Sequence, residues 1–341
     1  MKKAVFILYV ILILAIVLVG CADKNPAAPQ ETEPQERVSN EENMYFVMPK
    51  NMANTADGWS VVPNEVYRYT GGDTYSLAYT FPDSEGYRIC IHGSKVYYAP
   101  IYGGKVTCVD LNSGTEQILG ELPSGYIDYL LADGDRAFAI WGKEKQHILY
   151  EVSAQNTRAI CEDIVNQAEL ALGDGGLYFI DNADEMALMR YDLKTGETRK
   201  IADKAGIGKL EYDGGYVYSG TLDTRRYDVK TGESSFVASW SDYRFRDGWL
   251  YYTDYADDSA DRDPSLVEIL RRNLENGEIQ SCGIANIPYL GDLTFRRTVE
   301  FGEKGFIAYI TFVKEDTKYM YFPYGASQGI ELRISNSGAS K

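Results

Sequence analysis

The serine in Gly325-Ala326-Ser327-Gln328-Gly329 matches a Gly-x-Ser-x-Gly pattern, in which a sharp strand-to-helix turn exposes a nucleophilic hydroxyl. Such a nucleophile needs a histidine base, which follows the serine in the usual order of that motif. The two histidines, His92 and His147, both lie far upstream and lack the spacing of a metal-binding motif. The residues after Gly329 alternate as in a strand. The sequence therefore predicts a hairpin turn at Ser327 and structural roles for both histidines.

A second group with chemical potential is a run of aspartates between Tyr252 and Pro264. It contains Asp254, Asp257, Asp258, Asp261 and Asp263. Carboxylate oxygens at short intervals are the ligands that Ca²⁺ prefers, although the spacing differs from the EF-hand loop. The sequence leaves two interpretations open, a calcium site or a solvated acidic loop. No other cofactor is predicted.

Other catalytic patterns are missing from the sequence. There is no Cys-x-x-Cys pair for zinc or redox chemistry, no glycine-rich phosphate loop, and no Ser-x-Asp-x-Gly-x-x-Trp box. Fifty acidic residues always allow a pair of carboxylates, so hydrolysis by paired carboxylates stays open.

The first twenty residues have the composition of an export signal. Lys2 and Lys3 precede the uncharged apolar run 4–20, and such a segment is removed from the mature protein. An uncleaved membrane-spanning helix is the alternative. The run ends in Leu18-Val19-Gly20-Cys21, which resembles the lipobox of bacterial lipoproteins. The resemblance implies cleavage before Cys21, acyl chains on that cysteine, and anchoring to the outer face of the cell membrane.

The residues after Cys21 form a predicted flexible tether, 22–43. This segment is rich in Pro, Glu, Gln and Asn and has no aromatic residue, so it buries too little apolar surface to fold. We expect a signal peptide at 1–20, a lipidated cysteine and tether at 21–43, one folded domain at 44–335, and a disordered tail at 336–341.

Charge and cysteine content narrow the class of protein. Removal of the signal leaves 32 basic and 50 acidic residues, a formal charge of −18, which disfavours nucleic acid as a partner. Four cysteines besides Cys21 allow two disulfides, but no motif pairs them. Cys90 and Cys108 lie in alternating apolar runs, where a buried free thiol packs well. We favour free thiols for all four, at positions 90, 108, 161 and 282.

The body of the chain is an internal repeat. Each copy has a glycine-led turn, an aromatic alternating strand, a variable loop, a second strand, a glycine-containing turn and a third strand. The run just before the leading glycine supplies a fourth strand. The leading glycines are Gly58, Gly93, Gly134, Gly175, Gly214, Gly248 and Gly302. Their mean spacing of about 41 residues is typical of propeller blades.

These copies predict an all-β fold, a β-propeller of about seven four-stranded blades, or of six if the first copy only closes the ring. The turns Asp192–Glu197 and Asp228–Glu233 support it, because each has glycine where a tight hairpin needs positive φ. The Asp254–Pro264 loop and the 283–296 connection depart furthest from the repeat, so they form the predicted binding rim.

Two tetrads resemble the YWTD motif of low-density-lipoprotein-receptor-type propellers. They are Tyr251-Tyr252-Thr253-Asp254 and Tyr178-Phe179-Ile180-Asp181, and the turn at 190–196 fits the same repeat. Tryptophan is absent from both tetrads, and the receptor propellers have six blades. The resemblance implies a bacterial lipoprotein with a receptor-like propeller of unknown function, and it says little about activity.

Two functions of different kinds follow. The first is a non-catalytic binding or scaffolding module at the cell envelope, attached to the membrane through Cys21, with an envelope protein or glycan as partner. The alternative is a hydrolase or lyase that acts on envelope glycan or peptide with carboxylates at the propeller channel. The sequence favours the first, because it has many tyrosines for recognition and lacks a convincing catalytic set. It does not determine the oligomeric state.

Overall fold

The computed structural model describes residues 43–48, 53–55, 58–60, 65–82, 86–165, 169–220, 223–238, 244–255, 266–286, 297–302, 304–310, 318–324 and 329–334. All of them belong to one compact unit, Ser39–Lys341. The predicted signal, the lipobox, residues 22–42 of the tether and the tail 336–341 lie outside the described residues. Among the residues that the structure describes, no helix has the length and apolar character needed to cross a membrane.

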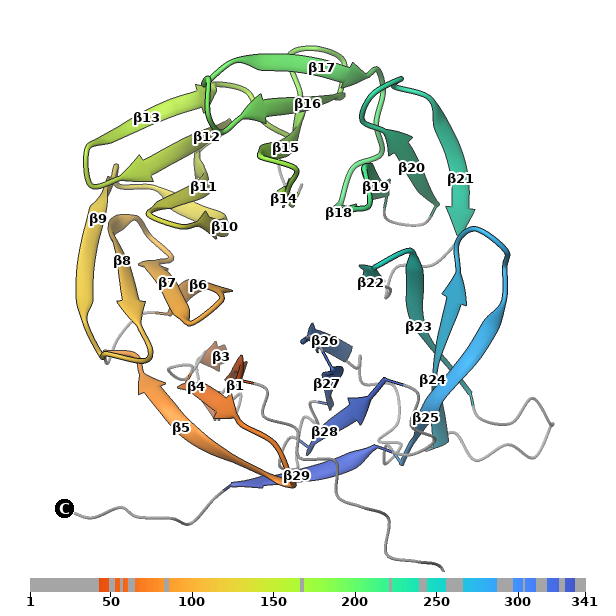
Figure 1. Cartoon of the computed structure of the whole chain (residues 1–341). Helices are drawn as coiled ribbons and strands as arrows, with labels where there is room; N and C mark the ends of the chain where they lie inside the picture. The colour runs from red at the N-terminus through yellow and green to blue at the C-terminus, as the bar shows by residue number, and fades with distance from the viewer. Residues whose placement is uncertain are drawn as a thin grey trace, which may run out of the picture. The chain divides into compact units, whose positions relative to one another are not determined.

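The unit is a β-propeller ring, in which each four-stranded blade pairs its strands in chain order from the axis outward (Figure 1). The first blade contains β6 (Tyr87–His92), β7 (Lys95–Pro100), β8 (Gly104–Asp110) and β9 (Glu116–Leu122). The second contains β10 (Tyr126–Asp133), β11 (Arg136–Lys143), β12 (Gln146–Ser153) and β13 (Asn156–Cys161). The third contains β14 (Ala171–Gly173), β15 (Gly176–Asp181), β16 (Ala187–Asp192) and β17 (Thr198–Ala202).

Three further blades follow along the chain. The fourth contains β18 (Lys209–Asp213), β19 (Tyr216–Gly220), β20 (Thr224–Asp228) and β21 (Ser234–Ala238). The fifth contains β22 (Arg244–Arg246), β23 (Trp249–Tyr255), β24 (Leu266–Asn273) and β25 (Ile279–Asn286). The sixth contains β26 (Arg297–Phe301), β27 (Gly305–Ile310), β28 (Lys318–Pro323) and β29 (Ile330–Ile334).

A three-stranded antiparallel sheet lies between the sixth and the first blade (Figure 1). Its strands are β1 (Met44–Met48), β4 (Glu65–Tyr69) and β5 (Thr74–Thr80). The outer strand β5 pairs in parallel with β29, and the Arg333 N–H donates to the Asp73 carbonyl at 2.7 Å. This pairing joins the N-terminal and C-terminal parts of the ring. The structure thus confirms a propeller, with six four-stranded blades and this additional sheet.

The first repeat copy differs from its predicted position. The sequence placed its leading turn at Gly58, but Gly58–Ser60 forms β3, which pairs with β2 (Ala53–Thr55) in a separate hairpin. The inner strand is β1 instead. The physical reason is burial, because Met44, Tyr45 and Phe46 are all buried within the ring.

A β-bulge recurs at the same level of the outer strand pair in most sheets. It occurs in β4–β5, β8–β9, β12–β13, β16–β17, β20–β21 and β24–β25. Each bulge leaves one extra residue on the outer strand, and it increases the local twist. The extra residues Leu119, Ile201 and Val237 are buried. The same bulge in β4–β5 identifies the three-stranded sheet as a member of the repeat.

The core lies between neighbouring sheets rather than inside any one of them. Ala99 and Val106 of the first blade pack with Ile127 of the second, in one of several apolar clusters. The three-stranded sheet contributes to two clusters, one shared with the first blade and one with the sixth. Every sheet therefore needs both neighbours to cover its apolar faces.

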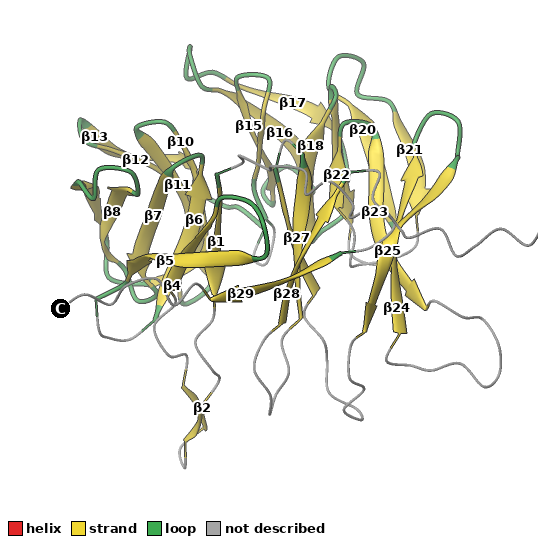
Figure 2. Ribbon diagram, turned by 60° about the horizontal axis from the view of Figure 1, so that its bottom comes forward, coloured by secondary structure: helices red, strands yellow, loops and turns green. Residues whose placement is uncertain are grey.

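Antiparallel pairing gives the ring two unlike faces. The turns between first and second strands and between third and fourth strands lie on one face, here named the turn face. The connections between second and third strands and between successive blades lie on the opposite, loop face. Figure 2 shows the turn face uppermost. The leading glycines from Gly93 to Gly302 lie on the turn face, as the repeat predicts.

In the first, third, fourth and fifth blades, the turns between third and fourth strands share one hydrogen-bonding pattern. The Asp228 carboxylate accepts the N–H groups of Lys230 and Thr231 at 2.7 and 2.9 Å. Asp192 and Asp110 accept the equivalent N–H pairs in their blades. Asn273 does the same with its amide oxygen in the fifth blade. These bonds lower the pKa of Asp228, chiefly through the N–H of Thr231.

We expect Asp228→Ala to lower the midpoint of thermal unfolding by a few degrees, because two backbone N–H groups lose their acceptor. Asp228→Asn should avoid most of that loss, because Asn273 shows that an amide oxygen can accept the same two N–H groups in this turn. The pKa of Asp228 is lower in the folded state, so its charge stabilises the fold above the unfolded pKa of about 4 and ceases to do so as the pH falls through the folded value.

Thermal unfolding followed by circular dichroism at pH 7 and pH 3 tests this pair. The advantage of the wild type over Asp228→Asn should shrink at pH 3. Equal midpoints for the alanine and asparagine variants at pH 7 would contradict the proposed role of the turn.

Candidate functional site

The residues singled out in the sequence mostly lie outside the described part of the structure. This holds for Leu18, Val19, Gly20 and Cys21, for the serine at 327, and for Asp257, Asp258, Asp261 and Asp263. Asp254 lies in β23, where its backbone pairs with Glu268. Lipid attachment and a calcium loop therefore stay predictions. Among the described residues, no group of three or more His, Cys, Asp or Glu side chains is placed to hold a metal ion.

The two predicted rim segments attach to the same face of the ring. The Asp254–Pro264 loop follows β23 and precedes β24, which is a connection between second and third strands. The 283–296 connection includes the end of β25 and precedes β26, which starts the next blade. Both connections therefore start and end on the loop face.

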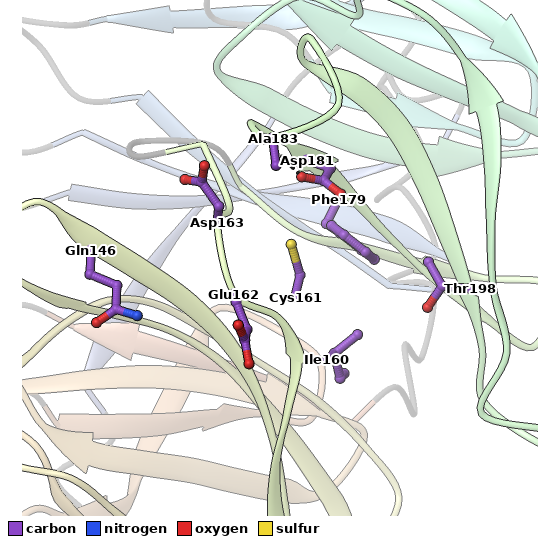
Figure 3. Close-up of a pocket in the computed structure, with 9 residues that line it drawn as sticks. All are labelled: Gln146, Ile160, Cys161, Glu162, Asp163, Phe179, Asp181, Ala183 and Thr198. Carbon is purple, nitrogen blue, oxygen red and sulfur yellow. Dashed lines mark hydrogen bonds between the residues drawn. The ribbon is translucent and has the colours of Figure 1, made fainter.

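A cavity of about 530 Å³ opens between the second and third blades (Figure 3). Gln146 begins β12, Cys161 ends β13, and Phe179 and Asp181 come from β15. The remaining lining residues are Ile160, Glu162, Asp163, Ala183 and Thr198. Because β12 begins and β15 ends on the loop face, the cavity belongs to that face.

Backbone and side-chain bonds hold the acidic wall of the cavity in place. The Asn182 amide donates to both carboxylate oxygens of Asp163, at 3.0 and 3.2 Å. The Asn182 N–H donates to the Asp163 carbonyl at 2.8 Å, and the Ala183 N–H donates to the Asp181 carboxylate at 2.9 Å. The exposed side chain of Glu162 completes this wall. The site is thus preformed, acidic and open to solvent.

The thiol of Cys161 lies inside this cavity but is poorly suited to nucleophilic chemistry. Burial raises the pKa of Cys161 to about 11, and the nearby carboxylates of Asp181 and Asp163 oppose its ionisation further. The Asp163 N–H partly offsets that effect. Since the thiolate is the reactive form, the thiol is inert near neutral pH. All four cysteines named in the sequence are free, as the sequence interpretation favoured.

A second group of charged residues lies on the inner strands that surround the ring axis. Lys209 and Arg244 contact the same oxygen of Glu211, at 3.2 and 3.1 Å. The other Glu211 oxygen accepts the N–H of Phe245 at 2.7 Å. Burial raises the pKa of Glu169, which precedes β14, and Glu211 raises it further, while Lys209 and Arg244 lower it.

The hydroxyl of Tyr129 on β10 belongs to the same electrostatic group. Burial raises the pKa of Tyr129 far above its usual range, and the charges of Glu169 and Glu211 add to this effect. Ionisable groups that perturb one another in this way are candidates for function. Four neighbouring blades, the second to the fifth, therefore contribute to one charged wall at the axis.

The histidines have the structural positions that the sequence predicts. His92 ends β6 beside the turn at Gly93. His147 lies in β12, with its Nε2 atom 3.7 Å from an Asp128 oxygen, which is too long for a hydrogen bond.

Sequence reasoning missed the residues of both sites. Glu162 and Asp163 follow the outer strand β13 directly, Glu169 precedes the inner strand β14, and Glu211 lies within the inner strand β18. A search for acidic residues next to strand ends would have found the first three. Their partners come from other blades, however, and only the assembled ring brings them together.

Comparison with known proteins supports the architecture. No family model matches the chain, and no curated protein matches its sequence. The structure of apo AztD from Citrobacter koseri is 11% identical, covers 84% of this chain and 86% of that chain, and has a TM-score of 0.51. A puromycin hydrolase mutant complexed with PGG is 11% identical, covers 87% of this chain and 53% of that chain, and has a TM-score of 0.57. At these identities the similarity establishes a β-propeller fold and no activity.

We expect the native Cys161 thiol to react slowly with Ellman's reagent at pH 8, because it is buried and its pKa is raised to about 11. A reference thiol placed at the exposed turn residue by Gln155→Cys should react at once. Denaturant should then make Cys161 equally reactive. Fast labelling of Cys161 in the folded protein would contradict its burial. If Cys161 did not react after unfolding without reductant, it would not be a free cysteine.

Proposed function

We propose that this chain is an extracytoplasmic lipoprotein, held on the outer face of the cell membrane by acyl chains on Cys21. Its β-propeller acts as a non-catalytic binding module whose loop face recognises an envelope protein or glycan. The lipobox-like sequence and the apolar run before it support the anchor. The two longest departures from the repeat begin and end on the loop face, which supports its role in recognition.

The observation on which the proposal rests most is the preformed cavity between the second and third blades. Its acidic wall is fixed by bonds from Asn182 and Ala183, so little ordering entropy is lost when a partner binds. The glutamate at its mouth, Glu162, is exposed and available to a partner. Recognition sites are typically concave surfaces with a few well-placed polar groups.

The chemistry of the described residues favours binding over catalysis. The Cys161 thiol has a raised pKa, which opposes formation of a thiolate. Both carboxylate oxygens of Glu211 are already engaged by Lys209, Arg244 and the Phe245 N–H. A carboxylate engaged in this way would have to break cross-blade bonds before it could act as a base or nucleophile.

We expect crosslinking in intact cells, with the full chain tagged at its C-terminus, to capture one recurrent envelope partner. Glu162→Lys should abolish capture because it reverses the charge at the cavity mouth. Trimming residues 254–264 tests the predicted rim in the same assay.

In parallel, Cys21→Ser should release the protein from the membrane fraction.

Glu233→Lys is the matched control, since Glu233 is equally acidic and exposed but lies at a turn on the opposite face, in the fourth blade. Equal capture by the Glu162→Lys variant would contradict the cavity as the binding site. Retention of the Cys21→Ser variant in the membrane fraction would contradict lipid anchoring.

The charged wall at the axis favours a second candidate, a hydrolase acting on envelope glycan or peptide. The half-buried Glu169 has a raised pKa, as suits a general acid, and the ion-paired Glu211 lies in the same charged group.

For this candidate we expect the purified full chain to release reducing ends from peptidoglycan fragments. Glu169→Gln should abolish the release and Glu197→Gln should leave it intact. No release by the wild type would rule out this substrate.

A further inference from the structure

Two tyrosines on the loop face, one from the first blade and one from the second, are exposed next to each other. Tyr102, in the connection between β7 and β8, is 62% exposed, and Tyr126, at the start of β10, is 41% exposed. Their ring centroids are 6.0 Å apart, with an angle of 69° between the planes. The rings therefore form a corner rather than a flat patch.

The backbone beneath this corner is fixed by hydrogen bonds between the β7–β8 connection and the β9–β10 connection. The Gly125 N–H donates to the Tyr102 carbonyl at 3.3 Å, and the Ile127 N–H donates to the Ile101 carbonyl at 2.7 Å. A Cβ atom at Gly103 would lie 2.3 Å from the Pro123 carbonyl oxygen, so the two connections are in direct contact. The aromatic corner is exposed on a rigid base and costs little entropy to immobilise on binding.

Arg88 forms the third side of the corner. Its guanidinium carbon lies 5.7 Å from the centre of the Tyr126 ring, and its Nη2 donates to the Tyr126 hydroxyl at 3.3 Å. Its Nε donates to the Ile127 carbonyl at 2.8 Å. A guanidinium has five N–H donors, so these bonds leave three for a ligand. Among the described residues, no carboxylate forms an ion pair with Arg88.

We propose that Arg88, Tyr102 and Tyr126 form a binding site for a carboxylated sugar residue of a glycan. The apolar C–H face of a pyranose ring packs on an aromatic face, whose electron density attracts the positive hydrogens. The sugar carboxylate meets the unused donors of Arg88 in the charge-assisted pairing that guanidinium favours. An extended peptide fits less well, because the backbone N–H groups of Ile101, Gly125 and Ile127 already donate to the carbonyls of Gly86, Tyr102 and Ile101.

This site shares no residue with the cavity between the second and third blades. Its test therefore has an outcome independent of the capture experiment. The overall negative charge of the protein is screened beyond about 8 Å at physiological ionic strength, so it does not prevent one carboxylate from reaching Arg88.

The probe is digalacturonate, titrated calorimetrically into the purified full chain at physiological salt, with digalactose as the uncharged counterpart. We expect binding of digalacturonate and much weaker binding of digalactose. Arg88→Gln should weaken digalacturonate binding by about tenfold or more, because the charge-assisted pair is lost. Tyr102→Ala should also weaken digalacturonate binding, and the variant should still bind digalacturonate more tightly than digalactose.

Phe236→Ala is the matched control, because Phe236 is an exposed aromatic residue, 57% accessible, on the outer strand β21. It should bind digalacturonate like the wild type. Three results would overturn the proposal: no binding by the wild type at millimolar concentrations, equal binding of the two sugars, or unchanged affinity in both site variants. Thermal unfolding of each variant separates loss of the site from loss of the fold.

Discussion

Packing of one sheet face against the next is the constraint on which the rest of this ring depends. Side chains on both faces of each blade enter apolar clusters shared with neighbours, as Phe138 and Leu177 do between the second and third blades. A blade with two apolar faces has no side that tolerates water, so it is stable only inside a closed ring. The recurrent bulge serves this packing, because it turns an additional apolar residue of each outer strand inward. Closure itself relies on a short parallel pairing of β5 with β29.

Polar contacts between blades add specificity to this apolar packing. Arginine side chains of one blade donate to backbone carbonyls of the next, as Arg136 does to Leu193 at 2.7 Å and Arg199 to Val229 at 3.1 Å. Glu151 is an enclosed charged example, with its side chain only 8% exposed and in contact with Tyr191 of the next blade. Burial by itself raises the pKa of Glu151, but hydrogen bonds from Arg158 and Tyr191 outweigh it and lower the pKa overall. Removing one partner would leave a buried charge unpaired, which costs more than the pair contributes.

The two faces of the ring differ in how regular their connections are. On the turn face, short Asx turns repeat with nearly the same bonds in several blades, so their sequences are constrained by geometry. On the loop face, connections differ in length and side chains from blade to blade. The acidic cavity and the corner of Arg88, Tyr102 and Tyr126 both occur there, between different pairs of neighbouring blades. A rigid ring with one variable face is suited to presenting several binding sites from the same scaffold.

The sequence by itself determined the repeat, the all-β class and the hairpin turns, because strand alternation and turn glycines are local properties of a few adjacent residues. It also predicted free cysteines from their apolar neighbours. Only the tertiary structure decided that Met44–Met48, and not the segment at Gly58, forms the inner strand of the first sheet, because burial by both neighbours selects it. Likewise, Gln146 and Asp181 line one cavity, and Glu211 pairs with Arg244, only when separate blades stack into a ring. Contacts between distant parts of the chain depend on that stacking, and no local pattern of residues encodes them.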